Sequence, residues 1–314
     1  MTDTGPLFVS SGNLIADRRY KAAIELASRG DFSAAADILA QTVELTPKFA
    51  TAWFALGAIR DRLGDRAGAV AAFEQARDAD PEDYHGARLQ LARLGSGEAT
   101  PAMTETYVRR LFDQYAARYD AALTEHLHYR GPVLLRDAVD AAMRAVKRPM
   151  HFRAMVDLGC GTGLAGAAFR PFVDRLAGID LSPAMIARAE SKNLYDRLAV
   201  ADLARFLAAE SAAAGRYDLA IAADVFVYVN DLAPILGAVA HVLAPGGILA
   251  FTVEAHSGDG VKLLATLRFA YGAKYLRATI AAAGLTLLTL AAAAIRTENG
   301  APVDGLVAVA IRQS

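Results

Sequence analysis

The stretch MVDLGCGTGLAGAAFR, residues 155–170, decides the fold class. An apolar run that ends at Asp157 leads directly into Gly159, Gly161 and Gly163, and the residues that follow suit a helix. A loop without side chains can turn sharply and let a ligand touch the main chain, while the start of the next helix offers unpaired N–H donors. The pattern therefore predicts a nucleotide-cofactor loop between a strand and a helix.

The glycines alone leave two cofactor classes open. Residues 161–166 also spell the G-x-G-x-x-G of dinucleotide-binding proteins. About twenty residues further on, Asp180 closes a second apolar run, where a carboxylate can accept hydrogen bonds from ribose hydroxyls. Both features occur in nicotinamide sites and in S-adenosylmethionine sites, so neither discriminates between them.

Strand-like runs alternate with helical segments through the second half of the chain, which predicts an α/β domain around a parallel sheet. The runs are AMVDLG, RLAGID, LAVAD, YDLAIAAD and GGILAFTVEA, at 154–159, 175–180, 198–202, 217–224 and 246–255. Near the end, the runs at 285–296 and 304–312 flank a turn-rich TENGAPV. That final pair predicts an antiparallel hairpin rather than another crossover.

The N-terminal residues 11–95 contain an internal repeat. The aligned pairs are Gly30 with Gly64, Asp31 with Asp65, Ala35 with Ala69, Leu39 with Phe73, and Pro47 with Pro81. Their offset of about 34 residues is the period of tetratricopeptide repeats, which stack pairs of helices. Because two repeats are fewer than the roughly three that a stack needs, we expect the helical stretch 84–94 to cap the open end.

A linker, expected at residues 96–104, separates the repeats from a helical segment at 105–150. The aromatic and apolar residues of that segment recur at helical intervals on one expected face: Tyr107, Leu111, Phe112, Tyr115 and Tyr119. The face either packs on the neighbouring sheet or forms a lid over a ligand.

Composition excludes several classes of function. The 33 Lys and Arg nearly balance the 34 Asp and Glu, so no net field attracts nucleic acid or acidic membranes. The opening residues lack the pattern of a signal peptide, and the apolar run at 285–295 is too short to cross a bilayer. Cys160 is the one cysteine, which excludes an internal disulfide and a cysteine-based zinc site. We therefore expect a cytoplasmic protein without a metal site.

From about Phe152 to Arg312 the chain resembles the class I S-adenosylmethionine-dependent methyltransferases. The resemblance is carried by five motifs in the family's order: VDLGCGTG, GIDLSPAMIARA with Asp180, VADL with Asp202, YDLAIAADVFVYV and LAPGG. The whole arrangement, repeats included, is similar to a group of bacterial predicted methyltransferases that carry tetratricopeptide repeats. The resemblance implies a Rossmann-like domain at 151–314, with a mostly parallel seven-stranded sheet and an antiparallel last strand, preceded by an all-α domain.

The resemblance also implies a cofactor, S-adenosyl-L-methionine, and roles for individual residues. The three loop glycines would hold the methionine part, and main chain near Ala223 would meet its end. Asp157 is expected to accept hydrogen bonds from the loop or to lie close enough to favour a cationic ligand. Asp180 would bind the ribose, and Asp202 would accept from the adenine amino group. The side chains expected on either side of the adenine are Leu181, Met185 and Leu203. Tyr115 and Tyr119 belong to the stretch that covers the cofactor in resembling enzymes, where ring faces attract a sulfonium.

A catalytic base is needed only if the acceptor is a hydroxyl or an amine, because a carboxylate is already ionised. His256 is the first candidate and Asp224 the second. The acceptor is expected to be a small molecule, and the repeats are expected to bind a protein partner or a second copy of the chain. The alternatives are a nicotinamide-dependent oxidoreductase, or an adaptor whose cofactor-binding domain is not catalytic.

Overall fold

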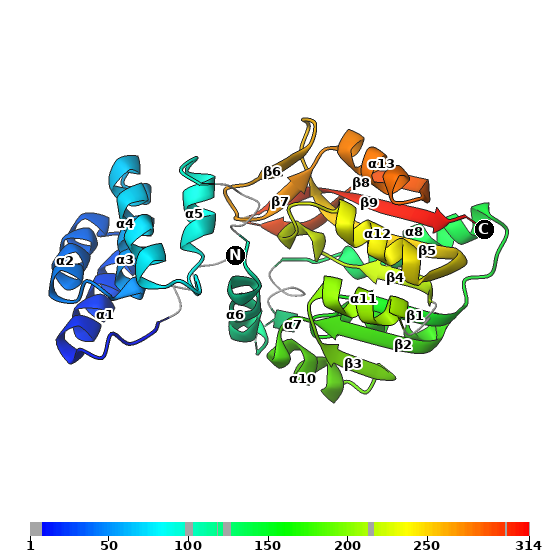
Figure 1. Ribbon diagram of the computed structural model, residues 1–314, viewed down its shortest axis with the longest axis horizontal. Coiled ribbons are helices and arrows are strands. Elements are labelled where there is room, and N and C mark those ends of the chain that lie inside the picture. The colour runs from blue at the N-terminus through cyan, green and yellow to red at the C-terminus, as the bar shows by residue number, and fades with distance from the viewer. Residues whose placement is uncertain are drawn as a thin grey trace. The chain divides into compact units, whose positions relative to one another are not determined.

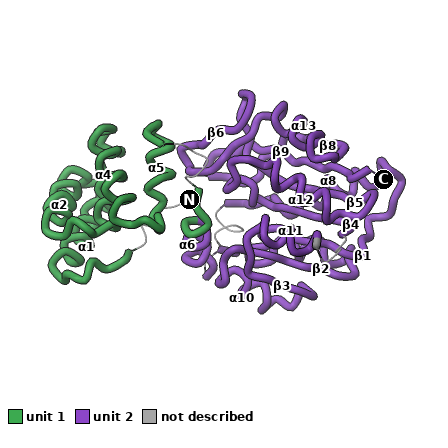
Figure 2. The backbone as a smooth tube through the Cα atoms, viewed as in Figure 1, with its two compact units in different colours: residues 1–107 green, residues 108–314 purple. Residues whose placement is uncertain are grey.

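The computed structural model describes residues 8–97, 103–117, 119–121, 127–212, 217–298 and 300–313. The chain forms two compact units, Met1–Tyr107 and Val108–Ser314 (Figure 2). Most of the linker expected at 96–104 lies outside the described residues, which lack 98–102.

Unit 1 is all helical (Figure 1). Its helices are α1 Leu14–Ser28, α2 Phe32–Leu45, α3 Ala50–Arg62, α4 Arg66–Ala79 and α5 Ala87–Arg93. The same local chemistry starts α2 and α4: Asp31 and Asp65 accept hydrogen bonds from the main-chain N–H groups of Ala34 and Gly68. A glycine with positive φ, Gly30 or Gly64, precedes each cap and ends the helix before it.

Helices α3 and α4 of unit 1 pack closely at Gly57. A Cβ added there would lie 2.8 Å from ring carbons of Phe73, which is fully buried. The neighbouring Trp53 donates from its indole nitrogen to the Pro47 carbonyl at 2.8 Å. Any side chain at position 57 would therefore clash with the Phe73 ring, so this position favours glycine.

Unit 2 contains one sheet of nine strands within the described residues, rather than the seven expected. The strands are β1 Phe152–Leu158, β2 Val173–Asp180, β3 Arg197–Val200, β4 Tyr217–Ala222, β5 Leu243–Ala255, β6 Val261–Leu263, β7 Phe269–Tyr271, β8 Leu285–Glu298 and β9 Ala301–Arg312. β1 to β5 run parallel in the order β3-β2-β1-β4-β5. β9 lies antiparallel between β5 and β8, which confirms the expected final hairpin. The two additional strands are the short antiparallel pair β6 and β7.

Helices cover the sheet of unit 2. They are α6 Glu105–Tyr115, of which residues 108–115 belong to this unit, α7 Tyr119–Ala121, α8 Gly131–Ala145, α9 Leu164–Phe169, α10 Pro183–Ser191, α11 Leu203–Ala212, α12 Ala233–Val242 and α13 Ala273–Ala282. α11, α12 and α13 lie side by side in front of the sheet in Figure 1. Among the described residues, no helix is both long and apolar enough to span a bilayer.

Two expectations for the segment 105–150 need correction. The aromatic face does not lie on one helix, because α6 ends at Tyr115 and Tyr119 begins α7. In α8, Leu135, Val139 and neighbouring apolar residues belong to the core, together with residues of β1, β2, β4, β5 and β9. α8 is thus a core helix, and only α6 and α7 remain as candidates for a lid.

We expect Gly57→Ala to destabilise unit 1 by about 1–3 kcal/mol, because the added methyl group overpacks the Phe73 ring. Trp53 is the one tryptophan of the chain, so its fluorescence during urea unfolding reports on unit 1. The matched control is Gly237→Ala in α12, where nothing lies within 4 Å of the added Cβ. That change should stabilise unit 2 by roughly 0.5–1 kcal/mol. An unchanged unfolding midpoint for Gly57→Ala would contradict the packing argument.

Candidate functional site

The candidate site lies at the carboxyl ends of β1, β2 and β4, where α/β sheets place their ligands. Gly159, Gly161 and Gly163 follow β1 with φ of +69°, +53° and +92°. A Cβ on Gly159 would lie 2.6 Å from Val225, so this position is closed by packing. At Gly161 the nearest side-chain atom, Cε1 of Tyr119, is 3.8 Å away. Within the described part of the chain, the main chain of Gly161 is therefore open on the side that a side chain would occupy.

Tyr195, which sequence reasoning missed, fills the space behind the glycine loop. Cβ atoms added at Gly163, Gly166 and Gly178 would approach its ring or hydroxyl to 3.0, 2.2 and 2.6 Å. Its hydroxyl donates to Oδ2 of Asp157 at 2.7 Å. Three glycines thus accommodate one aromatic ring, and two of them belong to the apparent G-x-G-x-x-G.

Asp157 is fully buried, as expected of an acid inside an apolar strand. Burial raises the pKa of its carboxyl group to about 7; the hydrogen bond from Tyr195 opposes the shift, and the charge of Asp180 adds to it. The second oxygen, Oδ1, has no hydrogen-bond partner among the described residues. Asp157 is therefore a buried acceptor with spare capacity beneath the loop.

Asp180, at the end of β2, holds the glycine loop in place. Its two oxygens accept from the main-chain N–H groups of Gly161 at 2.9 Å and Ser182 at 2.8 Å. Burial raises the pKa of this carboxyl group to about 6, against the effect of both hydrogen bonds. Each carboxylate oxygen can accept a further bond, so a pair of hydroxyls can still be bound.

Helix α10 starts as the sequence indicates. Ser182 is the N-cap and accepts from the N–H of Met185 at 3.0 Å, with Pro183 as the first helical residue. Asp113 of α6, which sequence reasoning missed, accepts from the Ser182 hydroxyl and from the Ala184 N–H. Met185 is 1% exposed, so its side chain belongs to the core.

Asp202 follows β3 and caps α11. Its Oδ1 accepts from the N–H groups of Ala204 at 2.9 Å and Arg205 at 3.1 Å. Oδ2 makes no hydrogen bond to the described part of the chain. Leu181 and Leu203, the expected neighbours of an adenine, are both partly buried.

A hydrogen bond from the glycine loop and an ion pair hold helix α7 in place. Asp120 accepts from the hydroxyl of Thr162, and it pairs with Lys192 at 2.6 Å. Tyr119 is thereby held beside Gly161, and its ring meets Phe112 edge-on at 6.0 Å between centroids. Burial raises the pKa of Tyr119 above its usual range, so its phenol stays neutral.

The other residues expected near the cofactor lie close by. Tyr115 is the last residue of α6 and is partly buried. Ala223 directly follows β4 and packs against the core. Beside these elements, the ring of Tyr228 stands edge-on to Phe112 at 5.2 Å between centroids.

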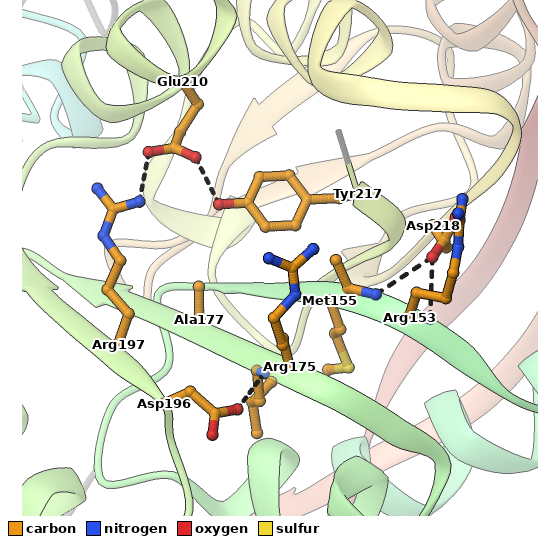
Figure 3. A pocket seen from close by; sticks show the side chains of 11 residues that line it. Arg153, Met155, Arg175, Ala177, Asp196, Arg197, Glu210, Tyr217 and Asp218 are labelled. Carbon is orange, nitrogen blue, oxygen red and sulfur yellow. Dashed lines mark hydrogen bonds and ion pairs between the residues drawn. The ribbon is translucent and has the colours of Figure 1, made fainter. Parts of the chain in front are cut away.

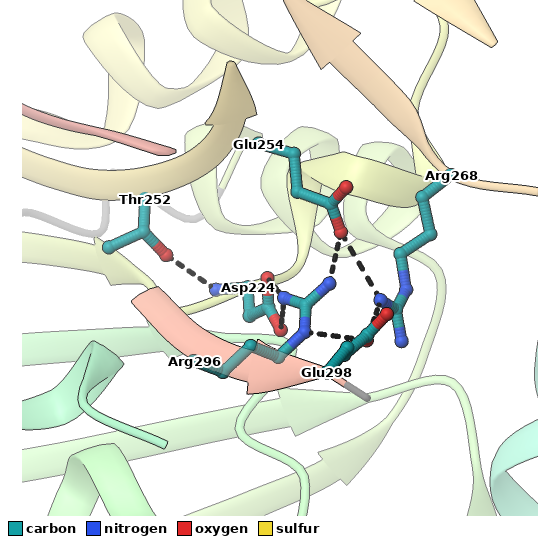
Figure 4. Close-up of polar contacts among 6 residues, drawn as sticks. All are labelled: Asp224, Thr252, Glu254, Arg268, Arg296 and Glu298. Atoms are coloured by element: carbon teal, nitrogen blue, oxygen red, sulfur yellow. Dashed lines mark hydrogen bonds and ion pairs between the residues drawn. The ribbon is translucent and has the colours of Figure 1, made fainter. Parts of the chain in front are cut away.

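A buried cluster of five charged side chains lies around the carboxyl ends of β4 and β5 (Figure 4). Three are acidic and two are basic: Asp224, Glu254, Glu298, Arg268 and Arg296. Arg296 donates through all three of its nitrogens, one to each carboxylate. Sequence reasoning found only Asp224, because the others are brought together from distant strands.

Both expected catalytic bases are engaged by other groups of the chain. Nδ1 of His256 lies 3.1 Å from the N–H of Gly258, which donates to it, and Nε2 lies 3.1 Å from the Gly260 carbonyl. Both oxygens of Asp224 accept from Nη1 of Arg296, at 2.9 and 2.8 Å. Other groups thus engage both side chains, and this geometry argues against a role as catalytic base for either of them.

A second hollow, lined by described residues of unit 2, lies elsewhere (Figure 3). This cavity of about 650 Å³ opens at the amino ends of β1, β2 and β4, opposite the glycine loop. Arg153 and Arg197 pair there with Asp218 and Glu210, and Arg175 extends into the space. None of the expected site residues lines it, so the cavity is separate from the candidate site.

Comparison with known proteins finds matches to the region around the loop. Residues 156–249 match the family model of a methyltransferase domain. Human methyltransferase-like protein 27 is 34% identical over 105 residues, which are 33% of this chain and 40% of that protein. The chain thus spans less than half the length of this curated relative.

Two solved structures are similar to the chain. The N-methyltransferase NodS from Bradyrhizobium japonicum, in complex with S-adenosyl-L-homocysteine, is 22% identical with a TM-score of 0.43; the match covers 57% of this chain and 87% of NodS. An S-adenosylmethionine-dependent methyltransferase from Clostridium acetobutylicum is 16% identical with a TM-score of 0.47; the match covers 65% of this chain and 100% of that enzyme.

We expect the free energy of unfolding of unit 2 to fall as the pH rises from 5 to 8. The pKa of Asp157 is about 7 in the folded chain and about 3.8 in the unfolded chain, so between these values the folded state holds more protons. Asp157→Asn removes this titrating carboxyl group. The decrease in the free energy of unfolding between pH 5 and 8 should then be smaller by on the order of 2 kcal/mol. Urea unfolding followed by circular dichroism at each pH measures it, with Trp53 fluorescence identifying the transition of unit 1.

Tyr195→Phe serves as the opposite control. It removes the hydrogen bond that favours the ionised form of Asp157, so the fall should extend to higher pH. Equal pH profiles for the wild type and Asp157→Asn would contradict the assignment.

Proposed function

We propose that unit 2 is an S-adenosyl-L-methionine-dependent methyltransferase. The observation that carries the proposal is the open main chain of Gly161, held by Asp180 on one side and faced by Tyr119 on the other. The match of residues 156–249 to a methyltransferase domain supports it. When bound, the cofactor supplies a methyl group on a sulfonium, whose C–S bond breaks as the bond to the acceptor forms, leaving the electron pair on a neutral thioether.

The described residues fit this cofactor. Asp180 would accept from the ribose hydroxyls, because each of its oxygens has so far accepted one hydrogen bond. The unpaired Oδ2 of Asp202 would accept from the adenine amino group, with Leu181 and Leu203 beside the ring and Met185 beneath it. Asp157 and Asp180 have no salt-bridge partner in the described chain, which suits a ligand that carries positive charge.

The remaining cofactor contacts would come from main chain and aromatic rings. Ala223 would present main-chain groups to the methionine end, next to the glycine loop. Tyr119, and Tyr115 one helix earlier, would cover the sulfonium with ring faces. We assign no general base, because His256 and Asp224 are both engaged; the protein would act by holding the acceptor in line and excluding water.

The nicotinamide alternative is disfavoured by the same geometry. In a dinucleotide site the second and third glycines let the pyrophosphate and a helix approach. In this chain, Gly163 and Gly166 accommodate the ring of Tyr195 instead. The acceptor is proposed to be a small molecule. The 33 Lys and Arg nearly balance the 34 Asp and Glu, so no net positive charge favours nucleic acid.

For unit 1 we propose two tetratricopeptide repeats, α1–α2 and α3–α4, with α5 as the cap. Two observations support this proposal. Helices α2 and α4 start at residues 32 and 66, which matches the repeat period, and the same Gly-Asp pair precedes both helices. Its role would be to bind a protein partner or a second copy of the chain. The adaptor alternative, with a non-catalytic unit 2, would require that Asp180→Ala leave the cellular role intact.

Calorimetric titration with S-adenosyl-L-homocysteine and with NAD tests the proposal directly. We expect saturable binding of the first and none of the second. Saturable NAD binding without S-adenosyl-L-homocysteine binding would overturn the methyltransferase. Transfer of a labelled methyl group into extracts of a deletion strain then identifies the acceptor.

We predict that Tyr119→Ala weakens S-adenosyl-L-homocysteine binding about tenfold while the fold survives, because the ring beside Gly161 is lost. Tyr119→Phe keeps the ring and should bind within about threefold of the wild type. Calorimetry on both variants, with circular dichroism as the folding check, separates ring from hydroxyl. Unchanged affinity of Tyr119→Ala would place the ring outside the cofactor site.

A further inference from the structure

We propose that Arg268 is a carboxylate-binding residue of the candidate site, which grips its ligand through the Nε–Nη2 edge of the guanidinium group. The proposal rests on the methyltransferase function and names a chemical group that the site recognises. It concerns the end of the site formed by β5, β7 and β8, where sequence reasoning gave Arg268 no role.

The two arginines of the buried cluster differ in how they are paired. Arg268 is 5% exposed and directly precedes β7. It reaches Glu254 at 3.2 Å and Glu298 at 2.5 Å, and both bonds use the same nitrogen, Nη1 (Figure 4). Arg296 donates from each of its nitrogens, whereas Nε of Arg268 has no partner among the described residues. Arg296 is therefore committed to the cluster through every nitrogen, whereas Nε of Arg268 is buried without an acceptor among the described residues.

A buried N–H group of a charged side chain without an acceptor is costly, so natural structures leave few of them. Nε and Nη2 of a guanidinium group lie on the same edge and donate in parallel. That edge matches the two oxygens of a carboxylate, and a lysine ammonium cannot reproduce it. The orphaned Nε of Arg268 therefore indicates a planar anionic partner that the chain does not itself supply.

The ion pairs of the cluster place Arg268 near the candidate site. Arg268 shares Glu254 with Arg296, and Arg296 pairs with Asp224, which follows β4. The charge of Arg268 also acts on Tyr119 and Tyr228. Tyr119 stands beside Gly161, where the cofactor is proposed to bind. The guanidinium group therefore lies at the end of β4 and β5, close to the residues of the proposed lid.

The charges of the cluster restrict what can bind. Asp224, Glu254 and Glu298 outnumber the two arginines, so the cluster is not a general anion trap. Only a group that takes both donors of the free edge is favoured, which selects a carboxylate over a monatomic anion. The sulfonium of the cofactor would offset the excess negative charge.

The same hydrogen bonds decide what the carboxylate does. An oxygen whose lone pairs accept two N–H bonds is a poor nucleophile, so the gripped carboxylate serves as a handle and is not itself methylated. The methyl group would go to a second nucleophilic group of the acceptor. The carboxylate belongs either to the acceptor or to the amino-acid part of the cofactor, and the experiment distinguishes the two.

The variant R268K keeps the positive charge beside Glu254 and Glu298 but removes the edge. NMR titration of the wild type and R268K with acetate and succinate, and with acetamide and succinamide as neutral isosteres, is performed with and without S-adenosyl-L-homocysteine. We expect both carboxylates to bind the wild type at least tenfold more tightly than the amides and to lose at least tenfold in R268K. R175K, in the separate cavity, is the matched control and should change neither.

A second titration identifies the source of the carboxylate. If R268K weakens S-adenosyl-L-homocysteine at least tenfold but leaves 5′-methylthioadenosine unchanged, the edge holds the amino-acid carboxylate of the cofactor. If both nucleosides bind R268K as they bind the wild type while succinate binding is lost, the carboxylate is that of the acceptor. Either result supports the proposal.

Two outcomes decide against it or against the proposed function separately. Carboxylates that bind the wild type no better than their amides, together with nucleoside affinities unchanged in R268K, would mean that Nε holds only water. Failure of S-adenosyl-L-homocysteine to bind would instead overturn the methyltransferase, while the titrations without it still decide on Arg268. If R268K does not fold, the Nε–H resonance of Arg268 in the wild type must shift on addition of acetate.

Discussion

The site depends on the carboxylate of Asp180, which is partly buried and accepts from the N–H groups of Gly161 and Ser182. One oxygen fixes the glycine loop after β1 and the other fixes the start of α10 after β2, so a single side chain sets the distance between two neighbouring loops. The N–H of Gly161 donates to Asp180, which fixes the orientation of this residue. Its open side can therefore face a ligand. Two further carboxylates extend this frame to the lid, since Asp113 binds the N-terminus of α10 and Asp120 binds Thr162.

Two groups of buried acids meet at the carboxyl edge of the sheet, and their surroundings differ. Burial raises the pKa values of Asp157 and Asp180, because no arginine or lysine side chain pairs with them in the described chain. Burial also opposes the ionisation of Glu298, but Arg268 and Arg296 hold its pKa at about 2. Asp157 and Asp180 thus lack a cationic partner in the described chain, whereas Glu298 has two arginines. A ligand with positive charge at one end and a carboxylate at the other would complement both groups.

Sequence patterns predict those structural features that are determined by residues close together in the chain. The Gly-Asp starts of α2 and α4, the Ser182 cap and the final hairpin follow from local rules, and the structure contains them. The short β6 and β7 were missed because three-residue strands carry almost no periodic signal. The core position of α8 was missed because an amphipathic helix looks the same whether it covers a core or a ligand. Three pairs of the charge cluster join residues that lie 30, 42 and 72 positions apart, and no local pattern reports such pairs.

The glycine motif shows why one pattern cannot decide between two cofactors. A glycine is needed wherever something approaches the main chain closely, and the sequence does not say whether a ligand or a side chain does so. Around this loop, Tyr195 approaches Gly163, Gly166 and Gly178, and Val225 approaches Gly159. Of these glycines, only Gly161 has open space with respect to the described residues. Two glycines of the G-x-G-x-x-G are therefore explained by an aromatic ring that lies thirty residues away. The ambiguity ends only when the neighbour of each glycine is known.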